Sequence, residues 1–211
     1  GLLPGHVGAP ASVAALNLEQ RQLDEAVRLS LEESEREADK LRLLRQRLET
    51  YTTLQLHQVD DSGHCQFDAV AYQIARRFPR AYPNLTQAER YSFRDVRRDL
   101  AAWLRRNADL ELDNGARVRD FLDEADGRDW AAFCDNVADE GCSKEPLWGN
   151  HLTLIAAANQ YQRPIRVWST YPGDDWWFQI DPKHMQARHH IKPFDLAHLH
   201  ERHYMALVER P

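Results

Sequence analysis

Apolar residues recur at helical spacing along the first two thirds of the chain and follow strand-like patterns toward its end. Residues 18–49 contain no glycine or proline and are rich in Leu, Glu, Arg and Gln, which predicts one long helix. Asn17 would cap this helix, with Gln20 completing a capping box. Residues 66–78 predict a second helix, because one apolar face runs along them. Pro79 would end this helix. That face carries Phe67, Val70, Ala71, Ile74 and Phe78.

Helical patterns continue through the middle of the chain. Thr86 and Glu89 form a second capping box, which opens a helix with apolar residues over 93–104. We interpret the arginines of that helix as its solvated face. Two short helices are expected within 116–140, and another over 152–161.

Strand-like runs dominate the rest of the predicted structure. Residues 51–59, 164–169, 175–180 and 203–208 have the alternating or β-branched and aromatic character of strands, and 171–174 have the composition of a turn. Helices early in the chain and strands late in it predict an α+β (α/β) domain. We expect a small central sheet flanked by helices and preceded by the long N-terminal helix.

Composition narrows the classes of function. The 211 residues are 43% hydrophobic, enough for one domain with a core, and carry a net charge of −6 with a sequence pI near 5.9. This charge argues against nucleic-acid binding through phosphate contacts. No apolar run approaches the roughly 18 residues needed to span a membrane. Three cysteines without a CxxC pair favour a reducing compartment over disulfides or a cysteine zinc site.

Cys65 is a candidate nucleophile because it stands at the predicted start of the helix over 66–78. Unpaired backbone N–H groups and the helix dipole stabilise a thiolate at such a position. The preceding residues Ser62, Gly63 and His64 could turn tightly and aim backbone N–H groups inward as an oxyanion loop. A buried structural cysteine is the alternative reading.

A cysteine nucleophile needs a base, usually a histidine that is distant in sequence. Six of the ten histidines lie between His184 and His203. His203 opens the last predicted strand, where it could be held rigidly, whereas His198 and His200 are expected in a surface loop. A metal cluster is disfavoured, because the histidine spacings do not share one helix face and no acid or cysteine recurs with them. We therefore expect no metal and no cofactor.

Four blocks, in this order, resemble the ovarian tumour (OTU) family of cysteine proteases. They read GHCQFDAVAYQI, VRRDLAAWLRRN, WGNHLTLIAAANQYQRPIRVWS and RHYMALV. The resemblance covers roughly residues 40–209. It implies a papain-like OTU fold and a thiol-dependent deubiquitinase that hydrolyses isopeptide bonds between the ubiquitin C-terminus and lysine. Cys65 would be the nucleophile and His203 the general base.

Two departures from the family pattern concern the third catalytic residue. Ser62 stands where the family has an aspartate, and Met205 stands where many members have an acid or amide. Asp61 is our first choice for the residue that orients His203, and Asp60 is the second. Either acid could instead organise the oxyanion loop, or a Cys–His dyad could work without an acid.

Part of the N-terminal helix resembles a ubiquitin-interacting motif, in which an acidic entry leads to Ala, three residues, Ser, two residues and an acid. The matching positions, with the apolar residues beside them, are Leu23, Ala26, Val27, Ser30 and Glu33. This stripe would meet an apolar patch on ubiquitin. A solvated amphipathic helix is the alternative.

The predicted organisation is a disordered tail over 1–16, the ubiquitin-interacting-motif-like helix over 17–40 and the OTU catalytic domain over 41–211. We expect a monomer that acts on ubiquitin, polyubiquitin chains or ubiquitinated proteins, without nucleic acid or membrane. It would work in the cytoplasm, or in the host cytosol if it is a secreted bacterial effector. Alternative functions are an inactive ubiquitin-binding module and a protease for a ubiquitin-like modifier. Trp148 and the Trp176/Trp177 pair are expected to line the cleft.

Overall fold

The computed structural model describes residues 13–77, 91–122, 129–139, 147–171, 176–183, 191–200 and 202–211. The chain forms two compact units, Gly1–Arg42 and Leu43–Pro211. Helix α1 (Val13–Tyr51) occupies the described part of the first unit and ends in the second.

Helix α1 begins earlier than the sequence pattern predicted. It starts at Val13, so residues 13–16 are helical and not part of a disordered tail, and Asn17 lies inside the helix and does not cap it. The physical reason is that the segment 13–16 has neither glycine nor proline to interrupt a helix. Two of its four residues are alanine, the strongest helix former.

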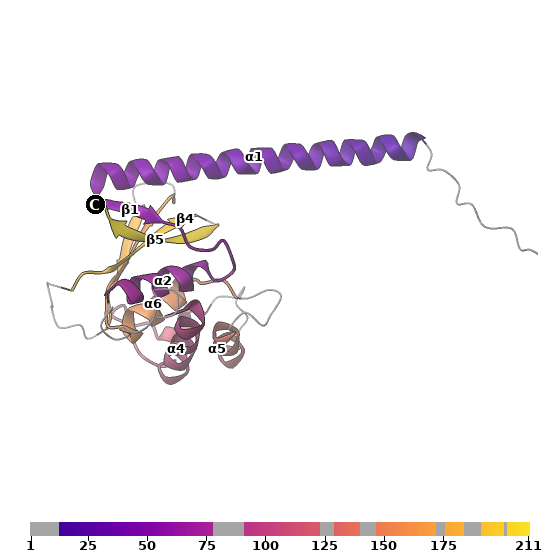
Figure 1. Cartoon of the computed structure of the whole chain (residues 1–211). Coiled ribbons are helices and arrows are strands. Elements are labelled where there is room, and N and C mark those ends of the chain that lie inside the picture. The colour runs from indigo at the N-terminus through magenta and orange to yellow at the C-terminus, as the bar shows by residue number, and fades with distance from the viewer. Residues whose placement is uncertain are drawn as a thin grey trace, which may run out of the picture. The chain divides into compact units, whose positions relative to one another are not determined.

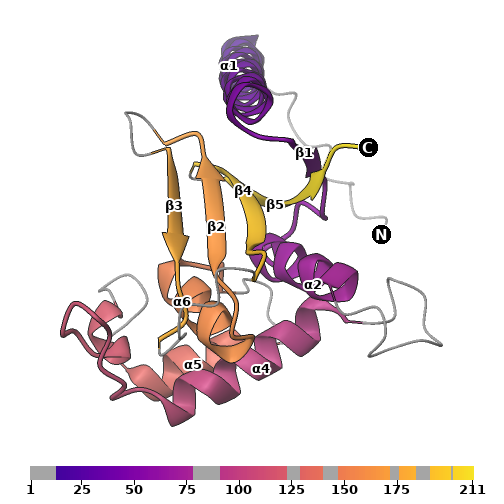
Figure 2. The same ribbon diagram turned by 90° about the vertical axis from the view of Figure 1, so that its left-hand side faces the viewer.

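Five strands form one mixed sheet in the order β1-β5-β4-β2-β3 (Figure 2). Their bounds are β1 (Leu54–His57), β2 (Ile165–Ser169), β3 (Trp177–Ile180), β4 (Phe194–Leu199) and β5 (His203–Glu209). Strands β4 and β2 are parallel, and the other three pairs are antiparallel. The inner strands β2, β4 and β5 are largely buried, whereas the edge strands β1 and β3 are partly exposed.

Strand β4 was missed in the sequence, and the prediction of a surface loop at His198 was wrong. His198 is a partly buried strand residue whose ring stacks on Tyr204 with centroids 4.3 Å apart. His200 lies in the turn after β4, where it makes an edge contact with Tyr171. A strand between two others is buried on both faces: Phe194 and Leu196 lie on one face of β4, and Ala197 and Leu199 lie on the other.

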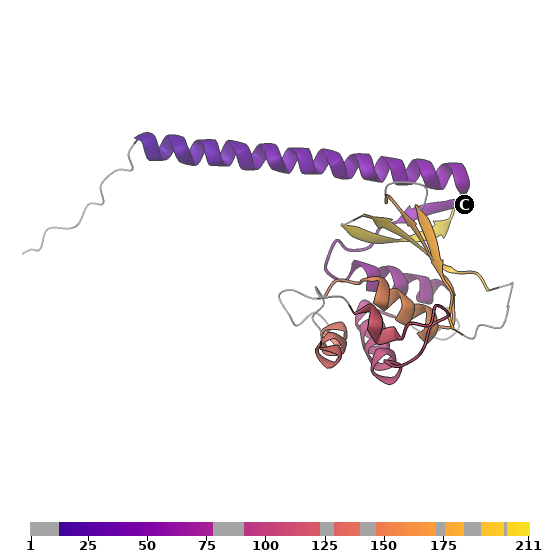
Figure 3. The same cartoon turned by 180° about the vertical axis from the view of Figure 1, so that it is seen from behind.

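The remaining helices are α2 (Cys65–Arg77), α4 (Phe93–Arg106), the short 3-10 helix η2 (Val118–Phe121), α5 (Trp130–Ala138) and α6 (His151–Gln160). Helices α2 and α6 pack against the sheet, α4 packs on both of them, and α5 packs on α4 (Figures 1 and 3). The capping box predicted at Thr86 and Glu89, like Phe78 and Pro79, lies outside the described residues. Helix α4 begins instead after Ser92, whose backbone N–H donates to Asp95 at 3.0 Å.

The core forms where α2 meets the sheet. Phe67, Val70, Ala71 and Ile74 are buried in one apolar cluster, as their helical spacing predicted. Within the sheet, helix α2 packs on β5 and, less extensively, on β4. This packing brings the first residue of α2 close to the first residues of β5. Within the described residues, no helix is long and apolar enough to cross a membrane.

Candidate active site

Cys65 and the start of β5 meet at the N-terminal end of α2. Cys65 is the first residue of α2 and is 8% exposed. The backbone N–H of Tyr204 donates to its Sγ at 3.4 Å. Since Tyr204 follows His203 in β5, the fold places the predicted nucleophile and the predicted base in one site.

Asp61 lies on the outer side of His203. Its Oδ1 is 3.4 Å from Nδ1 of His203, and its Oδ2 is 3.7 Å from Nη2 of Arg202. The Asp61 side chain is 67% exposed, whereas that of His203 is 8% exposed. This contact uses Nδ1 of the imidazole and so leaves Nε2 as the nitrogen for chemistry.

Asp60, the second choice, is placed differently. Within the described chain it has no ion pair or hydrogen bond with His203, and its charge acts on Asp68 in the first turn of α2. Burial, with a further contribution from Asp60, raises the pKa of Asp68 to about 6. The geometry thus favours Asp61 over Asp60 as the partner of His203.

The resting state of Cys65 differs from the stabilised thiolate that its position predicted. Burial raises the pKa of the Cys65 thiol, and the carboxylates of Asp61 and Asp68 raise it further. Backbone N–H groups of Tyr204 and Gln66 lower the pKa, by less than burial raises it but by more than either carboxylate does. The desolvation cost of an anion in a nearly closed site outweighs these donors, so the environment of Cys65 favours the neutral thiol over the thiolate.

The loop before Cys65 is closed by its own hydrogen bonds. The N–H of Ser62 donates to the Asp60 carbonyl at 2.9 Å, and the N–H of Cys65 donates to the Ser62 carbonyl at 3.1 Å. The N–H of His64 donates to Oγ of Ser62 at 3.3 Å. Ser62 therefore accepts from the backbone N–H groups of both His64 and Cys65.

Gln66 joins this site to the start of α6, and the sequence analysis missed it. The side chain is 2% exposed. Its Nε2 donates to the Asn150 carbonyl at 3.2 Å, and its Oε1 accepts from Oγ1 of Thr153 at 2.6 Å. A Cβ on Gly149 would lie 2.3 Å from the same Oε1, so only glycine fits there. The one signal in the sequence is the position of Gln66 directly after Cys65.

The prediction that the arginines of α4 form a solvated face was wrong for Arg97, which is fully buried. Its place three, four and seven residues before Leu100, Ala101 and Leu104 puts it on the apolar side of the helix, and this spacing could have revealed it.

An aromatic pocket of about 470 Å³ adjoins the start of β5. Its lining includes Tyr204, Trp177, His198 and His200. Trp177 lines this pocket and is 48% exposed, but Cys65 and His203 do not line it, so the place of Trp177 at the substrate cleft stays a prediction. Neither Trp176 nor Trp148 lines this pocket: Trp176 packs against two other aromatic rings, and Trp148 is 57% exposed.

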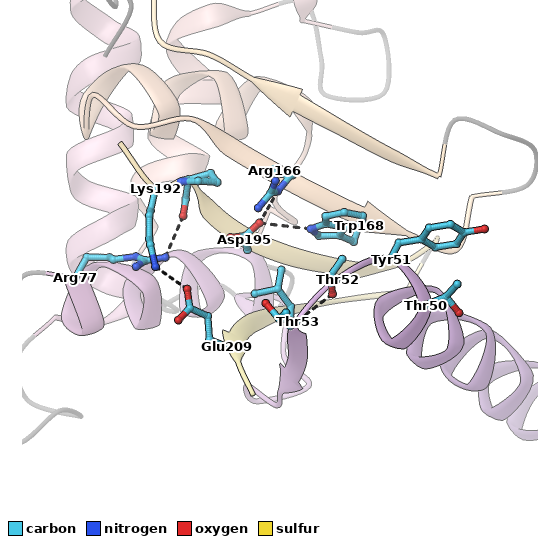
Figure 4. Close-up of a pocket in the computed structure, with 12 residues that line it drawn as sticks. Thr50, Tyr51, Thr52, Thr53, Arg77, Arg166, Trp168, Lys192, Asp195 and Glu209 are labelled. Atoms are coloured by element: carbon cyan, nitrogen blue, oxygen red, sulfur yellow. Dashed lines mark hydrogen bonds and ion pairs between the residues drawn. The ribbon is translucent and has the colours of Figure 1, made fainter. Parts of the chain in front are cut away.

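A second, larger pocket of about 580 Å³ contains neither Cys65 nor His203 (Figure 4). Two ion pairs occupy its wall, Arg166 with Asp195 at 2.6 Å and Lys192 with Glu209 at 2.7 Å. In each pair the positive and negative charges balance, and we assign no chemistry to this pocket.

No metal-binding cluster occurs among the described residues, in which no three His, Cys, Asp or Glu side chains could hold an ion together. His184, His189 and His190 lie outside them.

Solved structures are similar to this chain, although no family model and no curated protein sequence matches it. The OTU domain of OTUD1 is 14% identical over 79% of this chain and 90% of that domain, with a TM-score of 0.53. An OTU deubiquitinase from Wolbachia pipientis wMel, solved bound to ubiquitin, is 12% identical over 75% of this chain and 97% of that one, with a TM-score of 0.49. The similarity to the OTU domain of OTUD1 shows the fold of this chain. The chain has the α+β fold of an OTU domain, as its sequence blocks predicted.

Proposed function

We propose that this protein is a cysteine-type deubiquitinase that hydrolyses the isopeptide bond between the C-terminal carboxyl group of ubiquitin and a lysine amine. The observation that carries the proposal is the contact of the Tyr204 N–H with Sγ of Cys65, which joins the predicted nucleophile and the strand of the predicted base inside an OTU fold.

In the proposed first step, the Cys65 thiol gives its proton to Nε2 of His203, and Sγ bonds to the carbonyl carbon of ubiquitin's last glycine. The contact of His203 Nδ1 with Asp61 supports this assignment, because a carboxylate at 3.4 Å stabilises the imidazolium that forms. Because burial favours the neutral thiol of Cys65, we propose that proton transfer to His203 accompanies attack.

The oxyanion of the tetrahedral intermediate needs donors near Sγ. The N–H groups of His64 and Cys65 both point at Ser62 in the free protein, and we propose that the oxyanion replaces Ser62 as their acceptor. Each such donor contributes about 3–4 kcal/mol at comparable sites. His203 then protonates the lysine nitrogen, the C–N bond breaks, and a thioester remains. Water attacks the thioester after giving a proton to His203, which releases ubiquitin and restores the thiol.

A ubiquitin derivative with a C-terminal electrophile tests this proposal. We expect one covalent adduct per chain, located on Cys65, and none with Cys65→Ala. Cys134 is an internal control thiol, because it is fully buried and its pKa is raised to about 11 by burial. An adduct on Cys134, or no adduct with ubiquitin still bound, would overturn the enzymatic proposal.

The same reagent built on ubiquitin-like modifiers separates the remaining alternatives. A deubiquitinase reacts fastest with the ubiquitin form. Faster reaction with another modifier would assign the site to that modifier. Binding of ubiquitin without any reaction would assign the chain to non-catalytic ubiquitin recognition.

We further propose that the Gly1–Arg42 unit binds ubiquitin through α1. Leu23 and Val27 are 58% and 51% exposed on the helix, and Ala26, Ser30 and Glu33 beside them are exposed as well. Such apolar side chains on a charged helix are typical of a surface that a partner covers, and the small Ala and Ser leave space for close approach.

Ala26→Asp tests this binding surface, and Ala38→Asp, at an exposed position of the same helix, is the matched control. We expect Ala26→Asp to weaken ubiquitin binding about tenfold, a change of about 1.4 kcal/mol. Cleavage of long ubiquitin chains should slow with it, while the rate of adduct formation at Cys65 stays unchanged. Equal loss of chain cleavage and adduct formation would show that the helix supports only the fold.

A further inference from the structure

Arg97 of α4 is a fully buried arginine beside the Cys65 loop, and each of its five N–H donors has an acceptor. Its Nε donates to Nδ1 of His64 at 3.0 Å, and Nη2 donates to the Gly63 carbonyl at 3.3 Å and the Leu147 carbonyl at 2.7 Å. The two Nη1 contacts, at 3.4 and 3.2 Å, are with the carbonyls of Asn136 and Val137 in the last turn of α5. All five acceptors are neutral groups.

This set of contacts ties three segments together around one planar group. Two donors hold the loop before Cys65, two hold the end of α5, and one holds the segment that leads to Gly149. The guanidinium also lies over the ring of Phe67 in α2, with Cζ 3.9 Å from the ring centroid. Burial lowers the pKa of Arg97 to about 10, so it stays charged at pH 7. Burying a charge costs free energy that an apolar residue would not, so stability alone gives no reason for an arginine here.

The contacts at the loop fix the direction of a backbone donor. In a planar trans peptide unit the C=O and N–H bonds point in opposite directions. Because the Gly63 carbonyl points at Arg97, the His64 N–H must point away from it, toward Oγ of Ser62.

The His64 ring is fixed as well. Its Nδ1 accepts from Arg97, so the ring is neutral with its proton on Nε2, and it stacks on Phe93 with centroids 4.2 Å apart. Burial lowers the pKa of His64, and so does the charge of Arg97, which favours the same neutral form.

We propose that Arg97 is a positioning residue that aims the His64 N–H at the oxyanion by holding the Gly63–His64 peptide and the His64 ring. This role rests on the proposed function, but the placement of the loop by Arg97 can be measured without catalytic turnover. Arg97 acts through the loop and does not touch the substrate.

Arg97→Lys tests the role, with Arg97→Met as a second variant that removes the buried charge. Lysine keeps the charge but has three donors on one atom, so it cannot reach five acceptors in three directions. The matched control is Arg210→Lys, because Arg210 also donates to three carbonyls, those of Leu48, Thr52 and Leu54, away from Cys65.

For a fluorogenic ubiquitin amide, we expect both Arg97 variants to lower kcat about 100-fold per folded molecule, with KM changed less than threefold. Alkylation of Cys65 by iodoacetamide involves no oxyanion and should change less than threefold. Arg210→Lys should leave kcat unchanged even if it lowers the unfolding midpoint.

His64→Asn offers a conservative rescue, because its Oδ1 can accept from Arg97 where Nδ1 does. We expect it to keep kcat within about fivefold of wild type, whereas His64→Ala loses as much as Arg97→Lys. A loss of kcat that only follows the unfolded fraction, or a change in KM alone, would overturn the proposal.

If the wild-type protein cleaves no ubiquitin substrate, the proposed function fails and the role of Arg97 is judged by NMR. Ring nitrogen shifts of His64 should then report the Nε2–H tautomer in wild type and its loss in Arg97→Lys. Amide exchange at residues 62–65 should rise at least tenfold in that variant and not in Arg210→Lys. Unchanged tautomer and exchange would overturn the proposal.

Discussion

Gly149→Ala should disrupt the site through Gln66. The added Cβ would lie 2.3 Å from Oε1, 2.4 Å from Cδ and 2.6 Å from Cβ of Gln66. The first two atoms could move with the side chain, but the Gln66 Cβ is fixed to the first turn of α2. Part of the clash must therefore be relieved by a shift of the backbone next to Cys65.

The magnitude follows from these contacts. Overpacking of a buried site costs about 1–3 kcal/mol. Displaced Gln66 also loses its bonds to Asn150 and Thr153, at about 1 kcal/mol each. We expect the free energy of unfolding to fall by about 2–4 kcal/mol and kcat to fall more than tenfold, because the first turn of α2 moves with Gln66.

Urea denaturation measures the change in stability, and Gly115→Ala is the matched control. Gly115 has a φ of +82° but no atom within 4 Å of an added Cβ, so that variant loses about 1–2 kcal/mol from backbone strain alone and keeps its activity. Adding Gln66→Ala to Gly149→Ala should restore only part of the stability, since the Cβ at 2.6 Å remains. A loss below 1 kcal/mol for Gly149→Ala, or unchanged kcat, would refute this reasoning.

Three further predictions concern the acids and the thiol. Asp61→Asn should lower kcat about 10- to 100-fold and Asp60→Asn less than threefold; the reverse order would transfer the orienting role to Asp60. Because the folded-state pKa of Asp68, about 6, lies above its unfolded value near 4, Asp68 destabilises the fold increasingly as pH rises through that interval. Burying the Asp68 carboxylate costs about 2–3 kcal/mol. This cost exceeds the stabilisation of about 0.3–1 kcal/mol that a helix N-terminus gives to an acid. Asp68→Asn should therefore raise the unfolding free energy by about 1–2 kcal/mol at pH 7.5 and leave it unchanged below pH 4, and equal effects at both pH values would contradict it. Since burial raises the Cys65 pKa, iodoacetamide should alkylate free protein at pH 7 more slowly than free cysteine; faster alkylation would indicate a preformed thiolate.

The sequence predicted the parts of the fold in which one residue pattern decides the structure. Helix α2 and strand β5 are such parts, because their apolar spacing is regular and their ends are marked. Together they suggested Cys65 and His203 as a pair, and the resemblance of four sequence blocks to the OTU family supported it. Strand β4 was not predictable in this way: its histidine and its aspartate suggest a loop, and the strand is recognisable only once β2 and β5 pair with its two edges.

The polar groups behind the site were missed for a related reason. Residue type alone assigns Arg97 and Gln66 to solvent, although helical spacing places Arg97 on the apolar side of α4. Both can be buried because the loop carbonyls and the start of α6 satisfy their donors. Such partners come from other elements, so local sequence cannot indicate them. Asp61 was preferred over Asp60 from the sequence, and the contact of Asp61 with His203 supports that order.

The central claim is that Cys65 attacks the ubiquitin C-terminus. It is tested most directly by incubating the wild-type chain with ubiquitin dimers of each isopeptide linkage, beside Cys65→Ala and His203→Ala. We predict release of monomeric ubiquitin from at least one linkage by the wild type, and none by either variant. Dimers of every linkage left intact by the wild type, or cleaved equally by Cys65→Ala, would contradict the claim.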